Sequence, residues 1–311
     1  AAERGVQVAV LVELKARFDE ANNVQWARQL ERSGVHVVYG MVGLKTHSKV
    51  ALVVRNDGDM LRRYVHIGTG NYNAKTARIY EDLGVLTCSP DIGDDATQLF
   101  NHLTGYSRSE DYRNLLVAPR DLRRQLVDLI EHEASFGTDG HIVLKCNSIA
   151  DDELIETLYA ASAEGTRIDM IVRGICCLRA GVPGLSETIR VRSVLGRYLE
   201  HSRIYRFAHG NVIHGERLPT ATSDAVFLIG SADLMPRNLN RRVEVMVPIE
   251  HPRHTAALDQ ALEFALADDI VAWELQPDDT WTRVGPTNSF EPHSQERMYR
   301  WTVQQQLAGR S

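Results

Sequence analysis

The chain has 311 residues, 43% of them hydrophobic, and a formal net charge of −6 at pH 7. That length exceeds the usual size of a single core, and the apolar content is enough to bury two lobes. No apolar run approaches the ~20 residues that a membrane-crossing helix needs, which argues against an integral membrane protein.

The first part of the chain alternates strand and helix signals. A near-continuous apolar run at 6–14 predicts a buried parallel strand. Residues 23–33 predict a helix closed by Gly34, and 35–39 a further strand. Next come strands expected at 49–54 and 64–67 and a helix expected at 96–104. This alternation is typical of an α/β fold.

The alternation starts again after a junction near 108–118, so the predicted domains are 1–114 and 115–311. An amphipathic helix at 121–135 opens the second domain. Strands are expected at 142–145, 167–173, 189–194, 202–207, 226–229 and 243–249, and helices at 152–162, 254–267 and 294–306. Both domains are therefore predicted to be α/β, and the chain as a whole to have mixed sheets flanked by helices.

Cysteine usage and the start of the chain bear on its compartment. The cysteines have neither zinc-site spacing nor the density of a disulfide scaffold, so we expect reduced core thiols at Cys88, Cys146, Cys176 and Cys177. Residues 1–5 resemble the last turn of a helix without an initiating Met. We interpret the chain as the C-terminal part of a longer, homo-oligomeric protein that is cytoplasmic, with membrane association of the full-length form left open.

Positive charge is concentrated in two segments of an otherwise acidic chain. Residues 42–78 hold seven Lys or Arg against two Asp, and 173–206 hold seven Arg against two Glu. Each segment carries a net charge of +5. Because the whole chain carries −6, all the other residues together carry −16. A solvated strand face explains part of this, but two matched basic segments favour a focused anion site.

Each basic segment contains the same short pattern, a histidine two residues before a cation. The pattern is Leu-Lys-Thr-His-Ser-Lys at 44–49 and Tyr-Leu-Glu-His-Ser-Arg at 198–203. Residues i and i+2 of a strand point to one face, so His47 with Lys49, and His201 with Arg203, each set an imidazole beside a positive charge. Such a pair is suited to phosphate chemistry.

Each pattern is followed by a glycine-containing turn, at 68–71 and at 230–233. A lone strand histidine is more often structural than catalytic, but the recurrence of histidine, cation and turn in the same order favours two halves of one composite site. Asn71 and Asp233, which end the two turns, are candidates for orienting the histidines or for stabilising the turns themselves.

Several longer stretches resemble bacterial polyphosphate kinases of the histidine-phosphorylating type. These are Glu-Leu-Lys-Ala-Arg-Phe-Asp-Glu-Ala-Asn-Asn at 13–23, Gly-Leu-Lys-Thr-His-Ser-Lys-Val at 43–50, His-Ile-Gly-Thr-Gly-Asn-Tyr-Asn at 66–73, Thr-Ala-Arg-Ile-Tyr-Glu-Asp at 76–82 and Ile-Gly-Ser-Ala-Asp-Leu-Met-Pro-Arg-Asn at 229–238. The resemblance implies two phospholipase-D-like α/β domains in tandem. It also implies reversible transfer of the ATP γ-phosphate to inorganic polyphosphate through a phosphohistidine, with ATP, ADP and polyphosphate as partners and no nucleic acid.

The resemblance assigns a role to each motif residue. His47 matches the phosphorylated histidine, with Lys49 offsetting charge on the transferred oxygens. His201 matches the second histidine, which as imidazolium would protonate or stabilise the leaving phosphate oxygen. The residues implied for ATP and phosphate binding are Tyr80, Asp82, Arg173, His201 and Arg203. Without the resemblance, the residue pattern favours a core position for Tyr80.

The implied cofactor is Mg²⁺, and the residue implied at the Mg-phosphate site is Arg17. A guanidinium cannot ligate a cation, so its contact would be with Mg-bound phosphate oxygens. Two other functions remain open: a phospholipase-D-like phosphodiesterase or nuclease, and a catalytically silent anion-binding module. Val54 stands where the broader superfamily has an Asp after its His-x-Lys pair, which weakens the phosphodiesterase interpretation.

Overall fold

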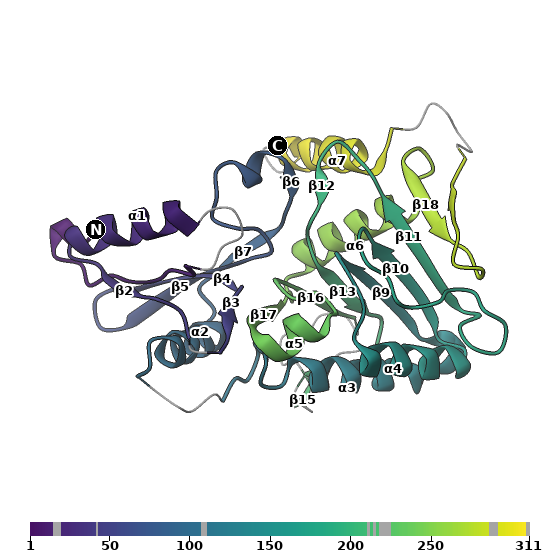
Figure 1. Cartoon of the computed structure of the whole chain (residues 1–311), viewed down its shortest axis with the longest axis horizontal. Coiled ribbons are helices and arrows are strands. Elements are labelled where there is room, and N and C mark those ends of the chain that lie inside the picture. Colours follow the sequence, from purple (N-terminus) through teal and green to yellow (C-terminus); the bar gives the residue numbers. More distant parts are fainter. Residues whose placement is uncertain are drawn as a thin grey trace.

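The computed structural model describes residues 1–14, 20–41, 43–106, 111–209, 212–213, 216–217, 225–285 and 292–308. The predicted α/β class, with mixed sheets flanked by helices, is confirmed (Figure 1). A smaller part, formed by the first strands and helices, lies beside a larger part built on one broad sheet.

The largest sheet that the described residues form has ten strands, in the order β19-β18-β11-β10-β9-β13-β16-β17-β3, with β8 also paired to β17. Its parallel centre is β9 (His141–Cys146), β10 (Arg167–Val172) and β11 (Ile189–Val194). Antiparallel strands continue it on one side: β13 (Ile204–Phe207), β16 (Val226–Gly230) and β17 (Arg242–Pro248). The shorter strands are β3 (Lys45–Thr46), β8 (Leu116–Ala118), β18 (Ala272–Leu275) and β19 (Trp281–Arg283).

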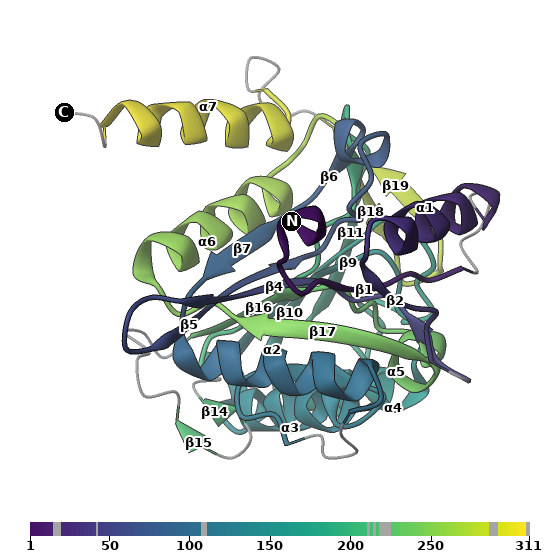
Figure 2. The same cartoon turned by 90° about the vertical axis from the view of Figure 1, so that its left-hand side faces the viewer.

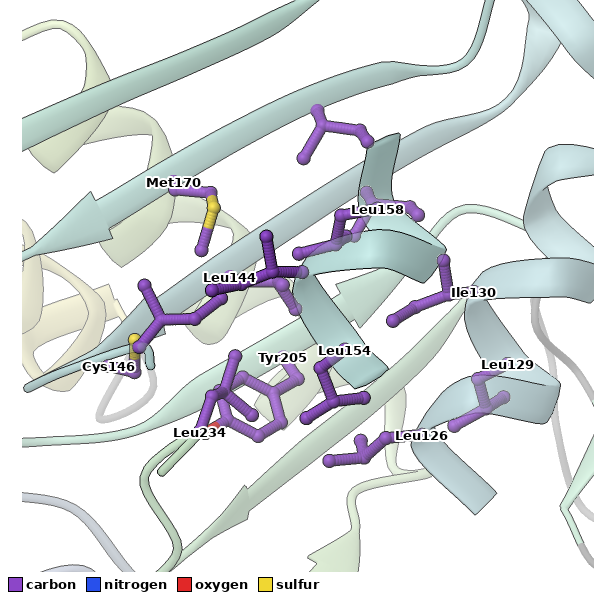
Figure 3. Close-up of a cluster of buried hydrophobic side chains, with 14 of the residues drawn as sticks. Leu126, Leu129, Ile130, Leu144, Cys146, Leu154, Leu158, Met170, Tyr205 and Leu234 are labelled. Atoms are coloured by element: carbon purple, nitrogen blue, oxygen red, sulfur yellow. The ribbon is translucent and has the colours of Figure 1, made fainter. Parts of the chain in front are cut away.

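Helices cover both faces of this sheet, and β9, β10 and β16 are accordingly buried along nearly their whole length. On one face lie α3 (Leu122–Ala134) and α4 (Asp152–Ala163), and on the other α6 (Pro252–Leu266) (Figures 1 and 2). Figure 3 shows the first interface, where α3 and α4 side chains meet residues of the central strands: Leu126, Leu129, Ile130, Leu144, Leu154, Leu158, Met170 and Tyr205. Helix α7 (Ser294–Ala308) packs on α6, and α5 (Pro236–Arg241) precedes β17.

The smaller part is built on an antiparallel sheet of β4 (Lys49–Asn56), β5 (Leu61–Gly68) and β7 (Gly84–Thr87), with α2 (Pro90–Leu103) against it. Strand β1 (Ala9–Leu11) pairs in parallel with β2 (His36–Val38), beside α1 (Glu20–Arg32). The prediction of a buried strand over 6–14 was therefore wrong in extent and burial, because β1 has one partner strand and its residues are exposed or half-buried.

Two strand pairings join the smaller part to the larger one. Strand β3 pairs in parallel with β17, with Lys45 opposite Arg242. Strand β6 (Tyr80–Glu81) pairs in parallel with β12 (Leu199–Glu200). The connecting segment is fixed by the buried Asp95 carboxylate of α2, which accepts backbone N–H bonds from residues 113, 114 and 115 at 2.7–3.1 Å. The two strand pairings fix β3, which precedes His47, against β17, and β12, which precedes His201, against β6.

The remaining elements are short. They are β14 (Val212–Ile213), β15 (Glu216–Arg217) and the 3₁₀ turns Ala2–Arg4, Thr76–Arg78 and Gly137–Asp139. All four cysteines are free, as predicted, but Cys146 alone is buried and Cys88 and Cys177 are exposed, so the expectation of core thiols held for one of them. Among the described residues, none of the helices has the length and apolar character to cross a membrane.

Candidate active site

His47 directly follows β3 and is held by β17. Its backbone N–H donates to the Val243 carbonyl at 3.0 Å, and its ring Nδ1 lies 2.8 Å from Oε2 of Glu244. The Glu244 side chain is fully buried, whereas 22% of the His47 side chain is exposed. A carboxylate accepts hydrogen bonds only, so Nδ1 carries the proton and Nε2 keeps a free lone pair.

Glu244 is itself fixed by two further donors. Ser231 Oγ donates to Oε2 at 2.5 Å, and Asn238 Nδ2 donates to Oε1 at 2.7 Å. Burial lowers the pKa of His47, and although Glu244 raises it, the net direction is downward, with Lys49 and Arg242 contributing. The ring is therefore neutral at neutral pH, which is the form that a nitrogen nucleophile requires.

Lys49, the first residue of β4, is 6% exposed and donates from Nζ to the His47 carbonyl oxygen. His47 lies between β3 and β4, so the pair does not share one strand as predicted. Burial lowers its pKa to about 7, and Arg203 and Arg242 lower it as well. A lysine poised in this way gains a full charge when a phosphate anion approaches, because an opposite charge favours the protonated form.

His201 follows β12 and is held by the smaller part of the chain. Its Nδ1 lies 2.7 Å from Oδ1 of Asp82, and the same Asp82 oxygen accepts a bond from Thr69 Oγ1 at 2.7 Å. The Tyr80 ring is tilted against the His201 ring, with centroids 4.8 Å apart. Tyr80 is thus half-buried beside the second histidine rather than in the core.

Burial lowers the pKa of His201, as do Arg203 and Lys49, while Asp82 opposes them. The free site therefore favours the neutral ring, and the predicted imidazolium role requires the negative charge of a bound phosphate to raise that pKa. Arg203 lies beside the ring and donates to the His201 carbonyl oxygen at 2.8 Å.

A chain of hydrogen bonds connects Arg203 to Arg173. Arg203 is 2% exposed and donates to both Asp233 oxygens at 3.0 and 3.2 Å. Asp233 also accepts the Asn147 backbone N–H at 2.8 Å, and the Asn147 side chain accepts from Arg173 Nε at 2.7 Å. Arg173 follows the carboxyl end of β10, where α/β sheets bind ligands.

The two histidine motifs interact electrostatically. Lys49 lowers the pKa of His201, and Glu244 raises the pKa of Arg203. Burial lowers the pKa of Arg173, and Arg203 adds to this by repulsion. The structure thus brings together the site residues predicted from the sequence within its described ranges: His47, Lys49, Tyr80, Asp82, Arg173, His201 and Arg203. Arg203 repels the positive forms of Lys49, Arg173 and His201, and such mutual repulsion favours binding of an anion.

Glu244 was not predicted from the sequence. Its one signal is a carboxylate inside the otherwise apolar run Val-Glu-Val-Met-Val at 243–247, since such a buried acid needs a partner. Of the two turn residues considered for orienting the histidines, Asp233 pairs with Arg203 instead. Arg17 lies outside the described residues.

The described residues do not fit a protein-held metal ion. Over the ranges that the structure covers, no group of three or more His, Cys, Asp or Glu side chains gathers into a metal site. The acids at the centre are engaged: Glu244 by His47, Asp82 by His201 and Asp233 by Arg203. Mg²⁺ keeps several waters and is commonly bound through substrate phosphates, so we derive no catalytic step through it.

Comparison with known proteins places this chain in a family. The family models for polyphosphate kinase C-terminal domain 1 and C-terminal domain 2 match residues 1–109 and 115–295. A polyphosphate kinase of Synechocystis sp. is 56% identical over 302 residues, which are 96% of this chain and 40% of that protein. One from Streptomyces coelicolor is 54% identical over 286 residues, 91% of this chain and 37% of that protein.

A solved structure agrees with these matches. The crystal structure of polyphosphate kinase from Porphyromonas gingivalis superposes with a TM-score of 0.87 at 35% identity, over 99% of this chain and 46% of that one. The chain spans about two fifths of the length of the curated relatives it matches. With both domain models matched along its length, the chain belongs to the polyphosphate kinase family.

Proposed function

We propose that the full-length protein containing this chain is a polyphosphate kinase, which transfers the ATP γ-phosphate reversibly to inorganic polyphosphate through a phosphohistidine at His47. The observation that carries the proposal is the His47–Glu244 contact of 2.8 Å. It leaves Nε2 as the unprotonated nitrogen of a neutral ring, within a site of buried cations.

In the first step, the Nε2 lone pair of His47 attacks the γ-phosphorus. The bond from phosphorus to the β,γ-bridging oxygen breaks, and ADP leaves with that electron pair. Glu244 stabilises the positive charge that the ring acquires, and Lys49 offsets charge on the transferred oxygens. In the second step, a terminal oxygen of polyphosphate attacks the phosphohistidine, the N–P bond breaks, and the neutral ring returns.

We assign His201 and Arg203 to the leaving and entering phosphate oxygens. Arg203 is charged at all working pH values and is fixed by Asp233. His201 becomes an acid once phosphate has raised its pKa. Tyr80, Asp82 and Arg173 would contact the nucleotide and its phosphates, Asp82 acting also through His201. Mg²⁺ would arrive on the phosphates, with Arg17 contacting its phosphate oxygens.

The organisation of the full-length protein is part of the proposal. We assign residues 1–114 and 115–311 to two phospholipase-D-like catalytic domains, whose facing edges share the site through the β3–β17 and β6–β12 pairings. A cytoplasmic location and a homo-oligomeric full-length form remain predictions.

Incubation of the full-length protein with γ-labelled ATP tests the proposal. Acid-labile, base-stable label should appear on His47 and pass to added polyphosphate, and His47→Ala should abolish both. His254→Ala, a substitution on the exposed start of α6, is the matched control and should label normally. Diester hydrolysis without labelling would favour a phosphodiesterase, and label retained in His47→Ala would refute the nucleophile.

A further inference from the structure

Strands β6 and β12 carry site residues on one face and a buried ion network on the other. Successive strand residues point to opposite faces. Tyr80 and Asp82 therefore turn to His201, while the intervening Glu81 points the other way. Glu81 stands opposite Glu200 in the parallel pairing of β6 with β12 (Figure 1). Both carboxylates meet Lys145 of β9.

Lys145 uses all its donors in this contact. Its Nζ lies 2.7 Å from Glu200 Oε2, 2.9 Å from Glu81 Oε2 and 2.6 Å from Ser202 Oγ. Ser202 Oγ in turn lies 2.6 Å from Glu81 Oε2. Lys145 is 5% exposed, so the three partners replace its hydration. One ammonium from the central sheet thus joins the smaller part of the chain, through Glu81, to the segment that leads into His201.

The positive charge of Lys145 lies between two carboxylates that face each other. Two carboxylates opposite one another in a pairing repel, and Lys145 removes that repulsion. Burial opposes ionisation of Glu81, but Lys145 and Ser202 outweigh it and lower the pKa of Glu81. Burial likewise opposes the charge of Lys145, and Glu81 and Glu200 together raise its pKa. Glu81 and Lys145 therefore both stay charged at neutral pH.

Gln295, in the first turn of α7, braces the same segment from outside. Its Oε1 accepts the Tyr198 backbone N–H at 2.9 Å, and its Nε2 donates to the Tyr198 carbonyl at 2.8 Å and to Glu200 Oε1 at 2.6 Å. A Cβ at position 196 would lie 2.6 Å from the Gln295 side chain, so Gly196 is needed for this approach. The segment before His201 is therefore held on two sides.

We propose that Lys145, with Glu81 and Glu200, is a positioning clamp that aligns Tyr80 with His201 across the two parts of the chain. The clamp touches no substrate. It acts by fixing the spacing between the ring assigned to the nucleotide and the histidine assigned to the phosphates. This inference rests on the proposed function, because it takes ATP as the nucleotide that Tyr80 contacts.

Glu81→Gln in the full-length enzyme is the main test. The amide keeps the shape and leaves Lys145 paired with Glu200, so the protein should fold. A shift of about 1 Å at a reacting group can cost ~10²-fold in rate, and we expect kcat/KM for ATP to fall ~10–100-fold. Lys145→Met, which leaves two facing carboxylates, should be worse, and Lys145→Arg should recover part of the loss. Asp169→Asn is the matched control, a buried acid of β10 paired with His141 and Arg167.

A double-mutant cycle separates positioning from general damage. If Glu81 acts through Tyr80, the effects of Glu81→Gln and Tyr80→Ala should not multiply, since linked residues couple. The fold-loss of kcat/KM in the double variant should be smaller than the product of the two single fold-losses by a factor of at least about three. Asp169→Asn combined with Tyr80→Ala should show the full product. If the losses of Glu81→Gln and Tyr80→Ala simply multiply, as expected for the control pair, the clamp is overturned.

Hydrogen exchange tests the clamp without catalysis. In Glu81→Gln, the backbone amides of 79–82 and of 198–202 should lose protection together, while the rest of β9 and β10 keeps it, and Asp169→Asn should leave both segments unchanged. Unchanged protection in Glu81→Gln would overturn the clamp. A wild-type protein that forms no phosphohistidine would instead refute the kinase proposal, and the exchange measurement would still decide the clamp.

Discussion

Replacement of Glu244 by Gln should turn the His47 ring into the wrong tautomer. Asn238 Nδ2 donates to Oε1 at 2.7 Å, which fixes the amide oxygen of a glutamine at that place. The amide nitrogen then takes the Oε2 position, 2.8 Å from His47 Nδ1, and the Ser231 hydroxyl, which donates to Oε2 in the wild type, turns to accept from that amide. As a donor it selects the tautomer with the proton on Nε2, so the nucleophilic lone pair is lost.

The expected loss follows from the interactions removed. A hydrogen bond to a charged group contributes about 1.5–3 kcal/mol, and the analogous carboxylate-to-amide change in a serine protease triad lowers kcat on the order of 10⁴-fold. We therefore expect phosphoenzyme formation in Glu244→Gln to slow by roughly 10²–10⁴-fold, about 3–5 kcal/mol of transition-state stabilisation. Rapid-quench measurement of acid-labile label from γ-labelled ATP in the full-length protein gives this rate.

The pH dependence distinguishes this mechanism from loss of structure. Glu244 raises the pKa of His47 against the lowering by burial, and the neutral ring is the active form above that pKa. Without the carboxylate the pKa falls further, so the residual activity of Glu244→Gln should persist to lower pH than that of the wild type. Glu133→Gln is the matched control, because Glu133 is also fully buried and lies 2.9 Å from His209 Nδ1. A wild-type rate in Glu244→Gln, or an acidic limb that moves to higher pH, would refute the reasoning.

Four other outcomes are expected. His201→Ala should lower turnover ~10²–10⁴-fold, as loss of a general acid does, with a circular dichroism melt close to that of the wild type; normal turnover would contradict its role. Because the pKa of Lys49 is about 7, kcat/KM for ATP should fall as pH rises through that value, and Lys49→Arg should remove this basic limb. Arg173→Glu should weaken polyphosphate binding more than Arg120→Glu, and binding should weaken as salt rises through counterion release; equal losses would disprove a shared basic channel. Asp95→Asn should lower the free energy of unfolding by about 2–3 kcal/mol in urea titration, since its carboxylate accepts backbone N–H bonds from three consecutive residues.

Local patterns predicted the central elements well. The alternating stretch Ile-Arg-Val-Arg-Ser-Val at 189–194 and the amphipathic stretch at 121–135 match β11 and α3 to within one residue at each end. In both, burial of one face produces a hydrophobic period that is visible in the sequence. The short strands β8, β18 and β19 were missed, since three- and four-residue segments carry too little periodicity. Strand β1 was overestimated because an apolar run does not reveal how many strands will flank it.

Site residues that lie close together in the sequence could be predicted, but contacts between distant segments could not. His47 with Lys49, and His201 with Arg203, are visible in the sequence because their spacing is local. The partners of the two rings are not, because the Glu244 contact depends on the register of β3 against β17, and no local pattern fixes a register between strands so far apart. Asp82 was found through the resemblance, but its contact with His201 needed the structure.

The distance along the chain between His47 and Glu244, 197 residues, has a consequence during synthesis. Ribosomes add about 5–20 residues per second, so roughly 10–40 s separate the emergence of His47 from that of Glu244. Until β17 is made and pairs with β3, the imidazole is free to choose either tautomer and has no buried carboxylate to support a positive ring. In the proposed mechanism, a nascent or prematurely terminated chain that lacks β17 would therefore carry His47 without its orienting carboxylate, and phosphoryl transfer would begin only once β17 has paired with β3.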